Sequence, residues 1–425
     1  MEKKRTNWDR LDNTANLFPV ITSESMSNVY RISATLKEEI IPELLQEALE
    51  SVLPYFDMFR FKLKKGIFWY YFEENHKPAP KVIIESTYPC RYINAYENNE
   101  YLFRVTYYKS RINLEVFHAV SDGNGSLQFL KEITYQYLRL RYPEELGKKE
   151  INTISQYTSL DREDSYLSNY KHSAKKPYAD KPAVIIKGHM LPKAIFGIMH
   201  GYMSVSELKT VAKKYGVTIN QYLVGCYIWS IYKEVLGSQP SAKPISVACP
   251  VNLRNYFNSS TMRNFFVVVS CAFKPERDDY TFEEVLEISA NSLKDQVTRE
   301  KLEERFSYNV SNEKNMALRM VPLFVKNIAI NAIYWKSTKA NTSTITNMGV
   351  FQVDGDFEKF IDKFHIVLSM TKGQNIKGAV CSYGDTLTIT FSSAIEETKV
   401  QKTFFRKIVE DGVNISVETN GVYYE

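Results

Sequence analysis

A histidine and an aspartate that could carry out proton-transfer chemistry lie four residues apart in the segment 118–125, which reads HAVSDGNG. A histidine with a pKa near neutrality, such as His118, can take a proton from a hydroxyl, thiol or amine and later return it. The Asp122 carboxylate could instead pair with an arginine and orient the loop. Gly123 and Gly125 would allow positive φ and close approach of a ligand to the backbone. Because the pattern is short, a buried structural histidine followed by an ordinary Asp-Gly turn is the alternative.

The residues around this segment predict a strand before it and a helix after it. Apolar residues and the histidine alternate along one face of the predicted strand: Ile112, Leu114, Val116 and His118. Residues at helical spacing follow on one stripe: Leu127, Leu130, Thr134, Tyr137 and Leu138. Rigid elements on both sides of a turn fix the side chains that the turn carries, so this is a suitable place for a reactive histidine.

Other segments of the chain predict further strands and helices. The predicted strands cover 28–36, 58–63, 67–72, 82–87, 101–108, 112–117, 245–251, 264–273, 342–346, 365–370, 377–382 and 386–391. The predicted helices cover 37–53, 127–142, 204–215, 218–236, 280–299 and 396–410. This mixture indicates an α/β chain.

The pattern His118-x3-Asp122-Gly123 resembles the signature of the chloramphenicol-acetyltransferase-like acyltransferases. This superfamily includes peptide-synthetase condensation domains, plant acyltransferases, wax-ester synthases and alcohol acetyltransferases. Three more segments resemble family motifs in the same order: PYFDMFRFKLKKG (54–66), PVNLRNYFNSSTMRNFF (250–266) and TNMG (346–349). The bacterial alcohol-acetyltransferase-like branch is the most similar. Many relatives carry two adjacent histidines, and here Phe117 occupies the first position, whereas in the family the second histidine carries the chemistry.

The resemblance implies an α/β fold of two chloramphenicol-acetyltransferase-like subdomains, with mixed β-sheets flanked by helices. An active-site tunnel would run between them, with His118 near its middle. We expect the N-terminal subdomain to cover 1–190 and the C-terminal subdomain 191–425. The polar segment 143–192 is the expected linker or crossover.

The resemblance also implies a reaction. An acyl group would move from acyl-CoA to an alcohol or amine acceptor in a ternary complex, with His118 as general base. Asp122 and Gly123 would shape the catalytic loop, and Arg60 would pair with Asp122. A solvated strand face is the alternative for Arg60.

Three polar residues of the second half are candidates to support the substrate or an oxyanion. They are Arg254, Asn264 and Asn347, and a purely structural ion pair is the alternative for Arg254. No metal and no permanently bound cofactor is expected, and acyl-CoA would be a co-substrate.

Two other functions remain open. A free-standing condensation-type enzyme would take its donor from an acyl carrier protein. A catalytically silent protein would bind hydrophobic or thioester ligands without turning them over.

Composition bounds the function classes. The chain has 425 residues, a formal net charge of +5 and only short, scattered basic clusters, which argues against a nucleic-acid binder. Five cysteines without metal-ligand spacing indicate a reduced, cytoplasmic setting. No signal peptide is recognised at the start of the chain. The run 316–335 contains charged and amide side chains, so it predicts a buried or cleft-lining helix and no membrane span.

Overall fold

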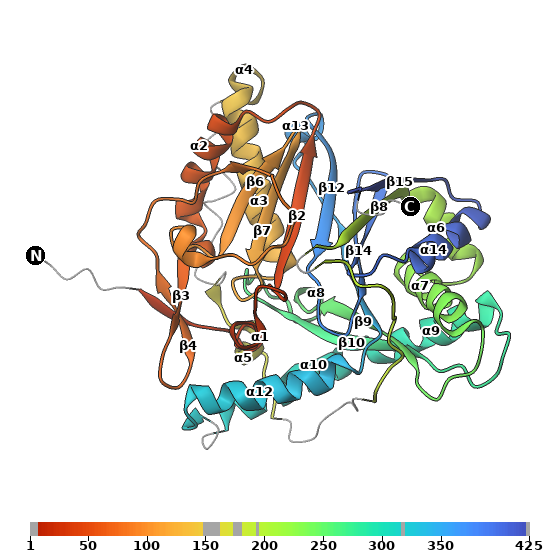
Figure 1. Ribbon diagram of the computed structural model, residues 1–425. Helices are drawn as coiled ribbons and strands as arrows, with labels where there is room; N and C mark the ends of the chain where they lie inside the picture. The colour runs from red at the N-terminus through yellow and green to blue at the C-terminus, as the bar shows by residue number, and fades with distance from the viewer. Residues whose placement is uncertain (1–6, 148–161, 173–180, 193–194, 316–318, 422–425) are drawn as a thin grey trace, which may run out of the picture.

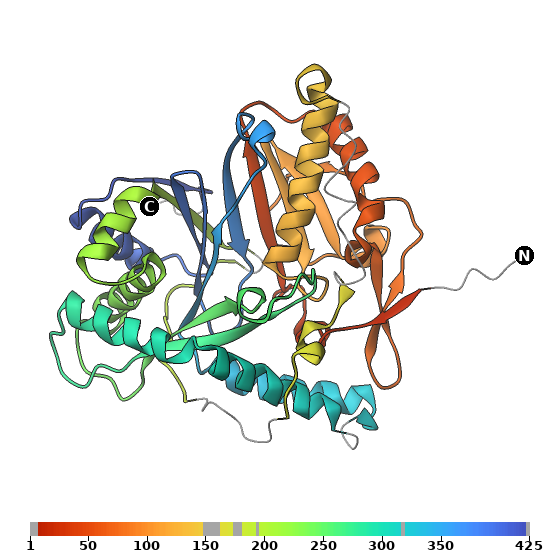
Figure 2. The same cartoon turned by 180° about the vertical axis from the view of Figure 1, so that it is seen from behind.

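The described residues form three β-sheets, and helices pack against the two larger ones (Figure 1). The computed structural model describes residues 7–147, 162–172, 181–192, 195–315 and 319–421. Much of the expected linker, 148–161 and 173–180, therefore lies outside the described residues. The view from behind shows the two larger sheets side by side, each with its own layer of helices (Figure 2).

The first large sheet has the strand order β12-β2-β7-β6-β5. Its strands are β2 (Val29–Leu36), β5 (Ile83–Ile84), β6 (Phe103–Tyr108), β7 (Arg111–Phe117) and β12 (Ile361–Leu368). The pairs are antiparallel except β5 with β6. Helices α2 (Pro42–Val52) and α3 (Gly123–Arg141) pack on one face of this sheet, where they bury the apolar residues of β7.

The second large sheet has the order β10-β9-β11-β13-β14-β8-β15. Its strands are β8 (Gly197–Ser204), β9 (Ile245–Asn252), β10 (Phe266–Phe273), β11 (Ser343–Val350), β13 (Ile376–Tyr383), β14 (Thr386–Ser393) and β15 (Ile415–Thr419). Strand β11 runs parallel to both of its neighbours, so this sheet is also mixed. Helices α6 (Val205–Lys214), α7 (Ile219–Leu236), α9 (Phe282–Gln296) and α14 (Lys399–Glu410) cover one face.

A small third sheet, β1-β4-β3, extends from the first half. It contains β1 (Trp8–Arg10), β3 (Phe61–Lys65) and β4 (Tyr70–Glu74). The remaining elements are α1 (Phe18–Ile21), η1 (Leu53–Tyr55), η2 (Asp57–Arg60), η3 (Ala95–Glu97), α4 (Pro143–Leu146), α5 (Ser165–Ser168), α8 (Arg254–Phe257), α10 (Arg299–Lys314), α12 (Leu323–Thr338) and α13 (Gly355–Glu358).

Local sequence signals explain where several helices begin and end. Ser204 accepts a hydrogen bond from the Glu207 N–H and caps α6. Thr218 and Gln221 form a capping box at the start of α7. Gly237, with φ of +58°, ends α7 in the left-handed conformation that glycine adopts without cost. Helix α3 begins at Gly123, four residues before the expected start.

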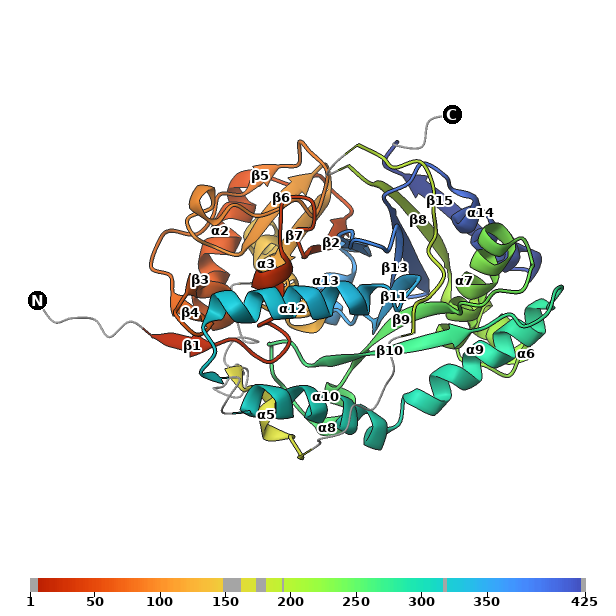
Figure 3. The same cartoon turned by 60° about the horizontal axis from the view of Figure 1, so that its bottom comes forward.

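Two elements of the second half pack on the first half. Strand β12 pairs with β2 and completes the first large sheet. Helix α12 docks on the β3–β4 hairpin: the Leu323 N–H donates to the Ile67 carbonyl at 2.8 Å. Figure 3 shows α12 running across the front from this hairpin toward the second large sheet. The boundary near residue 190 stays a prediction, and these two elements cross it.

All five cysteines are free and buried. No helix within the described ranges combines the length and apolar character needed to cross a membrane. The expected helix within 316–335 is α12, which begins at Leu323; residues 316–318 lie outside the description. Its side chains line a large cavity, so the cleft-lining interpretation is confirmed.

Candidate active site

His118 is the first residue after strand β7, and helix α3 begins five residues later. The backbone N–H of His118 donates to the Asn28 carbonyl at 3.0 Å, which continues the pairing of β7 with β2 by one residue. The predicted arrangement of strand, histidine, turn and helix is therefore confirmed. Phe117, which precedes it, is buried in the apolar core of the first half.

Aromatic rings hold the His118 imidazole from several sides. The Phe18 ring stacks on it, with centroids 4.5 Å apart and an interplanar angle of 13°. The Tyr30 ring meets it edge-on at 4.8 Å, and the Phe266 ring lies at 5.6 Å. These contacts restrict rotation of the imidazole and leave it only partly exposed, toward the cavity.

A chain of polar contacts sets which imidazole nitrogen carries the proton. Nδ2 of Asn264 donates to Oδ2 of Asp12 at 3.1 Å and to the His118 carbonyl at 3.2 Å. Its Oδ1 therefore faces Nδ1 of His118, at 3.1 Å. An amide oxygen can only accept, so Nδ1 of His118 carries the proton and Nε2 keeps its lone pair. Both amide hydrogens of Asn264 are engaged, which leaves none for an oxyanion.

Burial lowers the pKa of His118 below its usual value, and the nearby Lys377 ammonium acts in the same direction. The Asp122 carboxylate and the Asn264 side chain act against this shift. Burial also raises the pKa of Asp12 to about 7, helped by the charge of Asp164. At neutral pH the His118 ring is therefore unprotonated at Nε2 and able to accept a proton.

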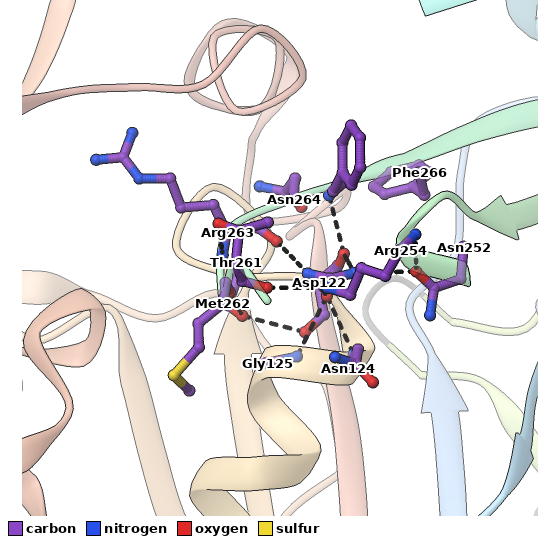
Figure 4. A network of polar contacts seen from close by, with 12 residues as sticks. Asp122, Asn124, Gly125, Asn252, Arg254, Thr261, Met262, Arg263, Asn264 and Phe266 are labelled. Carbon is purple, nitrogen blue, oxygen red and sulfur yellow. Dashed lines mark hydrogen bonds and ion pairs between the residues drawn. The ribbon is translucent and has the colours of Figure 1, made fainter. Parts of the chain in front are cut away.

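Asp122 organises the turn that follows His118 (Figure 4). Its Oδ1 accepts from the N–H groups of Asn124 at 3.1 Å and Gly125 at 3.2 Å, so it caps α3. Its Oδ2 accepts from the Phe265 N–H at 3.0 Å. The carboxylate thus joins α3 to the segment that leads into β10, on the other half of the molecule.

The arginine that pairs with Asp122 is Arg254, from the start of α8. Nη1 of Arg254 donates to Oδ2 of Asp122 at 2.7 Å, and Nη2 donates to Oδ1 at 3.1 Å. The other N–H groups donate to the carbonyls of Thr261 and Arg263 and to Oδ1 of Asn252. All five guanidinium donors are used, and both charged groups are buried.

The expectation that Arg60 pairs with Asp122 is wrong. Arg60 ends η2 beside the small third sheet, and it donates to Oε1 of Glu74 at 2.7 Å. Its side chain is 30% exposed, which fits the solvated alternative. The resemblance predicted an ion pair between an arginine and Asp122, but it indicated the wrong arginine. Arg254 forms this pair, which is the structural-ion-pair alternative for that residue.

The two glycines after Asp122 do not have the positive φ that we expected. They serve close packing instead. A Cβ on Gly125 would lie 2.3 Å from both the Met262 carbonyl oxygen and Oγ of Ser121. The Met262 carbonyl also accepts from Oγ of Ser121 at 2.5 Å, so Gly125 lets the loop before β10 approach α3.

Asn347 lies on the wall of the same cavity, where its Nδ2 donates to Oδ1 of Asn220 at 3.1 Å. Its Oδ1 accepts from the Gly349 N–H at 2.8 Å, which shapes the irregular end of β11. Gly123 also lines the cavity, at the start of α3. Both residues remain candidates for oxyanion support, and neither is placed against a reacting atom.

The cavity that His118 faces has a volume of about 2220 Å³. Its wall comes from both halves of the molecule and includes α1, β9, β10, β11, α10 and α12. This volume exceeds the ~300–1,000 Å³ typical of a small-molecule site, so two substrates could fit together. Within the described ranges, no group of three or more His, Cys, Asp and Glu residues is placed to hold a metal ion.

The sequence analysis missed three residues that hold or surround His118: Asp12, Phe18 and Tyr30. Asp12 and Phe18 precede the first predicted element, where neither a motif nor a periodic pattern marks them. Tyr30 lies in the predicted strand 28–36, in which nothing sets it apart from its neighbours. Lys377, whose charge lowers the pKa of His118, was not singled out either, although a lysine at the start of the predicted strand 377–382 was a usable signal.

Comparison of the sequence with family models gives no match, and comparison with curated proteins gives none either. The fold, in contrast, matches solved structures over nearly the whole chain. Polyketide synthase associated protein 5 from Mycobacterium tuberculosis has a TM-score of 0.58 at 12% identity, and 94% of this chain and 97% of that chain are covered.

Two condensation domains match equally well. The condensation domain of the Monacolin K polyketide synthase MokA has a TM-score of 0.56 at 10% identity, covering 95% of this chain and 96% of that chain. The starter condensation domain of rhizomide synthetase RzmA has a TM-score of 0.57 at 13% identity, covering 95% and 93%. The chain has the fold of a condensation domain.

The condensation-domain fold confirms the expected architecture of two chloramphenicol-acetyltransferase-like subdomains with mixed sheets and flanking helices. The RzmA domain was solved as a variant in complex with C8-CoA and Leu-SNAC. At 10–13% identity these matches concern the fold, and the chemistry must be argued from the residues of this chain.

Proposed function

We propose that the protein transfers an acyl group from a thioester to a hydroxyl or amine acceptor, with His118 as the general base. The observation that carries this proposal is the orientation of the His118 ring. Its Nδ1–H is directed at Oδ1 of Asn264, and its unprotonated Nε2 is left for a substrate in a cavity large enough for two. A structural histidine would not need a large cavity beside it.

In the proposed reaction, Nε2 of His118 takes the proton from the acceptor as its oxygen or nitrogen attacks the thioester carbonyl. The tetrahedral intermediate carries a negative charge on the former carbonyl oxygen, which needs hydrogen-bond donors. The Gly123 N–H and the Asn347 amide are the candidates. The C–S bond then breaks, and His118 returns its proton to the departing thiolate. No covalent enzyme intermediate forms in this scheme.

Acyl-CoA is our first choice of donor, and an acyl group on a carrier protein is the second. The RzmA starter domain was crystallised with C8-CoA, which supports a CoA thioester in this fold. The similarity to condensation domains from synthases supports a carrier-bound donor. The five free cysteines fit the cytoplasmic setting that we propose.

The test is thiol release from acyl-CoA of several chain lengths, with and without a panel of alcohols and amines. We expect acceptor-dependent release, and we expect His118→Ala to reduce it by about 100- to 10,000-fold, as for loss of a general base. His118→Gln serves as a second variant that keeps polarity without basicity. Equal rates in wild type and both variants would exclude His118 as the base.

The same assay with acyl groups on a carrier protein separates the two donors. Turnover with the carrier-bound donor alone would select the condensation-type alternative. Ligand binding without turnover of either donor would select the catalytically silent alternative.

A further inference from the structure

A buried lysine faces the cavity from the strand β13. Lys377 is 9% exposed and lines the same cavity as His118. Its neighbours two and four residues along the strand, Ala379 and Cys381, pack into the core of the first half, whereas Ile376 and Val380 pack into the core of the second. Strand alternation therefore directs Lys377 toward the space between the two sheets.

The Lys377 ammonium has no acidic partner in the part of the chain that the structure describes. Nζ donates to the Ser369 carbonyl at 3.0 Å and to Oγ1 of Thr371, both of which are neutral. A buried charge without a counter-charge is costly, and proteins normally pair it. Burial accordingly lowers the pKa of Lys377 to about 7. This lysine can be charged or neutral near physiological pH, depending on what lies beside it.

Neutral polar side chains surround Lys377 on the cavity wall. Thr344 lies opposite it on β11, and its hydroxyl donates to Oε1 of Gln374 at 2.7 Å. Thr346 and Ser369 also line this part of the cavity. The patch therefore offers hydrogen bonds and one positive charge to a group held in this part of the cavity. Such a patch suits a small anionic group.

We propose that Lys377 binds a carboxylate carried by one of the two substrates. The inference rests on the proposed acyl transfer and specifies its substrate class. Lys377 and His118 line the same cavity, so the carboxylate would belong to a substrate whose reacting group lies in that cavity. The phosphates of CoA are separated from its thioester by the long pantetheine arm, and they are poor candidates for this position.

The carboxylate has two possible sources, which the experiment distinguishes. It belongs either to a hydroxy or amino acid acceptor or to the acyl group of a dicarboxylic donor. Acetyl-CoA and succinyl-CoA are each combined with 1-butanol and with 4-hydroxybutyrate, and kcat/KM is measured for wild type, Lys377→Met and Lys377→Arg. A higher kcat/KM with 4-hydroxybutyrate than with 1-butanol identifies the acceptor as the source of the carboxylate. A higher kcat/KM with succinyl-CoA than with acetyl-CoA identifies the donor.

We expect the wild type to prefer the carboxylate-bearing substrate from one source. In Lys377→Met the kcat/KM for that substrate should fall at least about 30-fold, as when one member of a buried charge pair is removed. The loss is expressed relative to the neutral pair, acetyl-CoA and 1-butanol, measured with the same variant, and Lys377→Arg should keep part of the preference. A Met side chain matches the length of the lysine stem, so we expect the variant to fold, as circular dichroism can verify.

Lys372→Met is the matched control. Lys372 belongs to the same connection between β12 and β13 but is exposed, with Nζ 3.9 Å from the centroid of the Trp335 ring. The Lys372→Met variant removes one positive charge, as Lys377→Met does, but leaves Lys377 and its hydrogen-bond partners unchanged. The substrate preference of this variant should equal that of the wild type.

A binding measurement tests the carboxylate site independently of turnover. Free 4-hydroxybutyrate and succinate are added to the wild type and to both Met variants, and Tm is recorded. An increase in Tm that Lys377→Met loses and Lys372→Met keeps supports the carboxylate site, even if no substrate pair is turned over. An increase that Lys377→Met retains, or no increase together with no carboxylate preference, overturns it.

Discussion

At the scale of single residues, the decisive feature is the orientation of an amide. Asn264 can present only its oxygen to His118, because its nitrogen is held by Asp12 and by the His118 carbonyl. The neutral carboxamide of Asn264 therefore fixes the tautomer of His118, and the Asp12 carboxylate fixes the orientation of that carboxamide. The proposed proton transfer would thus depend on Asp12, which lies 106 positions before the histidine in the sequence.

The protonation of Asp12 should appear in the pH profile of activity. Its pKa is raised to about 7, and a proton on Oδ2 would displace an N–H of Asn264. We expect kcat/KM of the wild type to fall as the pH drops through about 7. In Asp12→Asn this inflection should disappear, and the acidic limb should move below the usual histidine value, since the pKa of His118 is lowered.

Asp164→Asn is the companion variant for this prediction. The charge of Asp164 raises the pKa of Asp12, so its removal should move the inflection to lower pH without abolishing it. A profile that is identical in all three proteins would show that Asp12 does not control the base.

The two arginines give a prediction about stability. Arg254→Met leaves the buried Asp122 carboxylate without its counter-charge, which should cost about 3–5 kcal/mol of unfolding free energy. Arg60→Met removes a partly exposed pair with Glu74, for which about 1 kcal/mol or less is expected. Urea unfolding of the two variants measures both values. Similar losses, or a larger loss for Arg60→Met, would contradict the assignment.

Residues whose signals lie close together in the sequence could be predicted, whereas residues whose partners lie far away in the sequence could not. His118 and Asp122 lie in one short motif with its strand and helix, so the sequence analysis found them. Arg254 pairs with Asp122 across 132 positions, and nothing in one sequence measures that distance. The bond was therefore predicted for Arg60, the arginine that the resemblance indicated.

At the scale of elements, the turn from β7 into α3 works because the loop before β10 can approach it. Gly125 provides the space for the Met262 carbonyl, and Asp122 binds the Phe265 N–H just beyond. The turn that carries His118 is therefore fixed by the other half of the molecule as well as by its own strand and helix.

The two glycines of this turn should differ in their tolerance of a methyl group. In Gly125→Ala the new Cβ would overlap the Met262 carbonyl, which belongs to the backbone, so we expect a cost of about 1–3 kcal/mol and reduced activity. In Gly123→Ala it would meet Sδ and Cε of Met348 at 2.6 and 2.8 Å, and this flexible side chain can move.

Thermal unfolding and the thiol-release assay measure these effects. Neither glycine has positive φ, so backbone strain does not confuse the comparison. A variant at Gly123 that is as damaging as the one at Gly125 would contradict the proposed role of the close approach.

Elements with strong periodicity were predicted well, and elements with weak periodicity were not. The strands at 28–36 and 112–117 and the helix at 218–236 agree with β2, β7 and α7 within a residue or two at their ends. Strand β8 was missed because Gly197–Ser204 contains two glycines and a histidine. Helix α10 was missed because its sequence is mostly polar.

At the scale of the whole molecule, two buried histidines connect the large sheets. Nε2 of His365, on β12, lies 2.8 Å from the Tyr202 hydroxyl on β8, and that hydroxyl donates to Glu418 on β15 at 2.7 Å. The His200 ring lies 4.6 Å from His365 and its Nδ1 lies 2.8 Å from Oγ1 of Thr390. Burial lowers the pKa of His200 to about 3 and that of His365 well below its usual value.

This pair should make the protein less stable in acid. Below pH ~6.5 the unfolded chain binds protons at both histidines and the folded chain does not, so unfolding becomes more favourable as the pH falls. The expected loss is about 2–3 kcal/mol between pH 7 and 5.5. It should be measured as the difference in unfolding free energy between wild type and the double variant His200→Gln, His365→Gln.

Taking this difference removes the contributions of other titrating groups, including Asp12, whose raised pKa acts in the opposite direction. A difference that is constant from pH 7 to 5.5 would show that the folded protein accepts protons at this pair.

The place of β12 in the first large sheet also has a consequence for how the protein is made. Strand β2 leaves the ribosome early, but its partner β12 follows roughly 300 residues later. At about 5–20 residues per second, the outer edge of β2 stays open for roughly 15 to 60 s. An open strand edge is a template for pairing with another chain. The nascent first half therefore passes through an aggregation-prone period, which ends only when the last quarter of the chain has been translated.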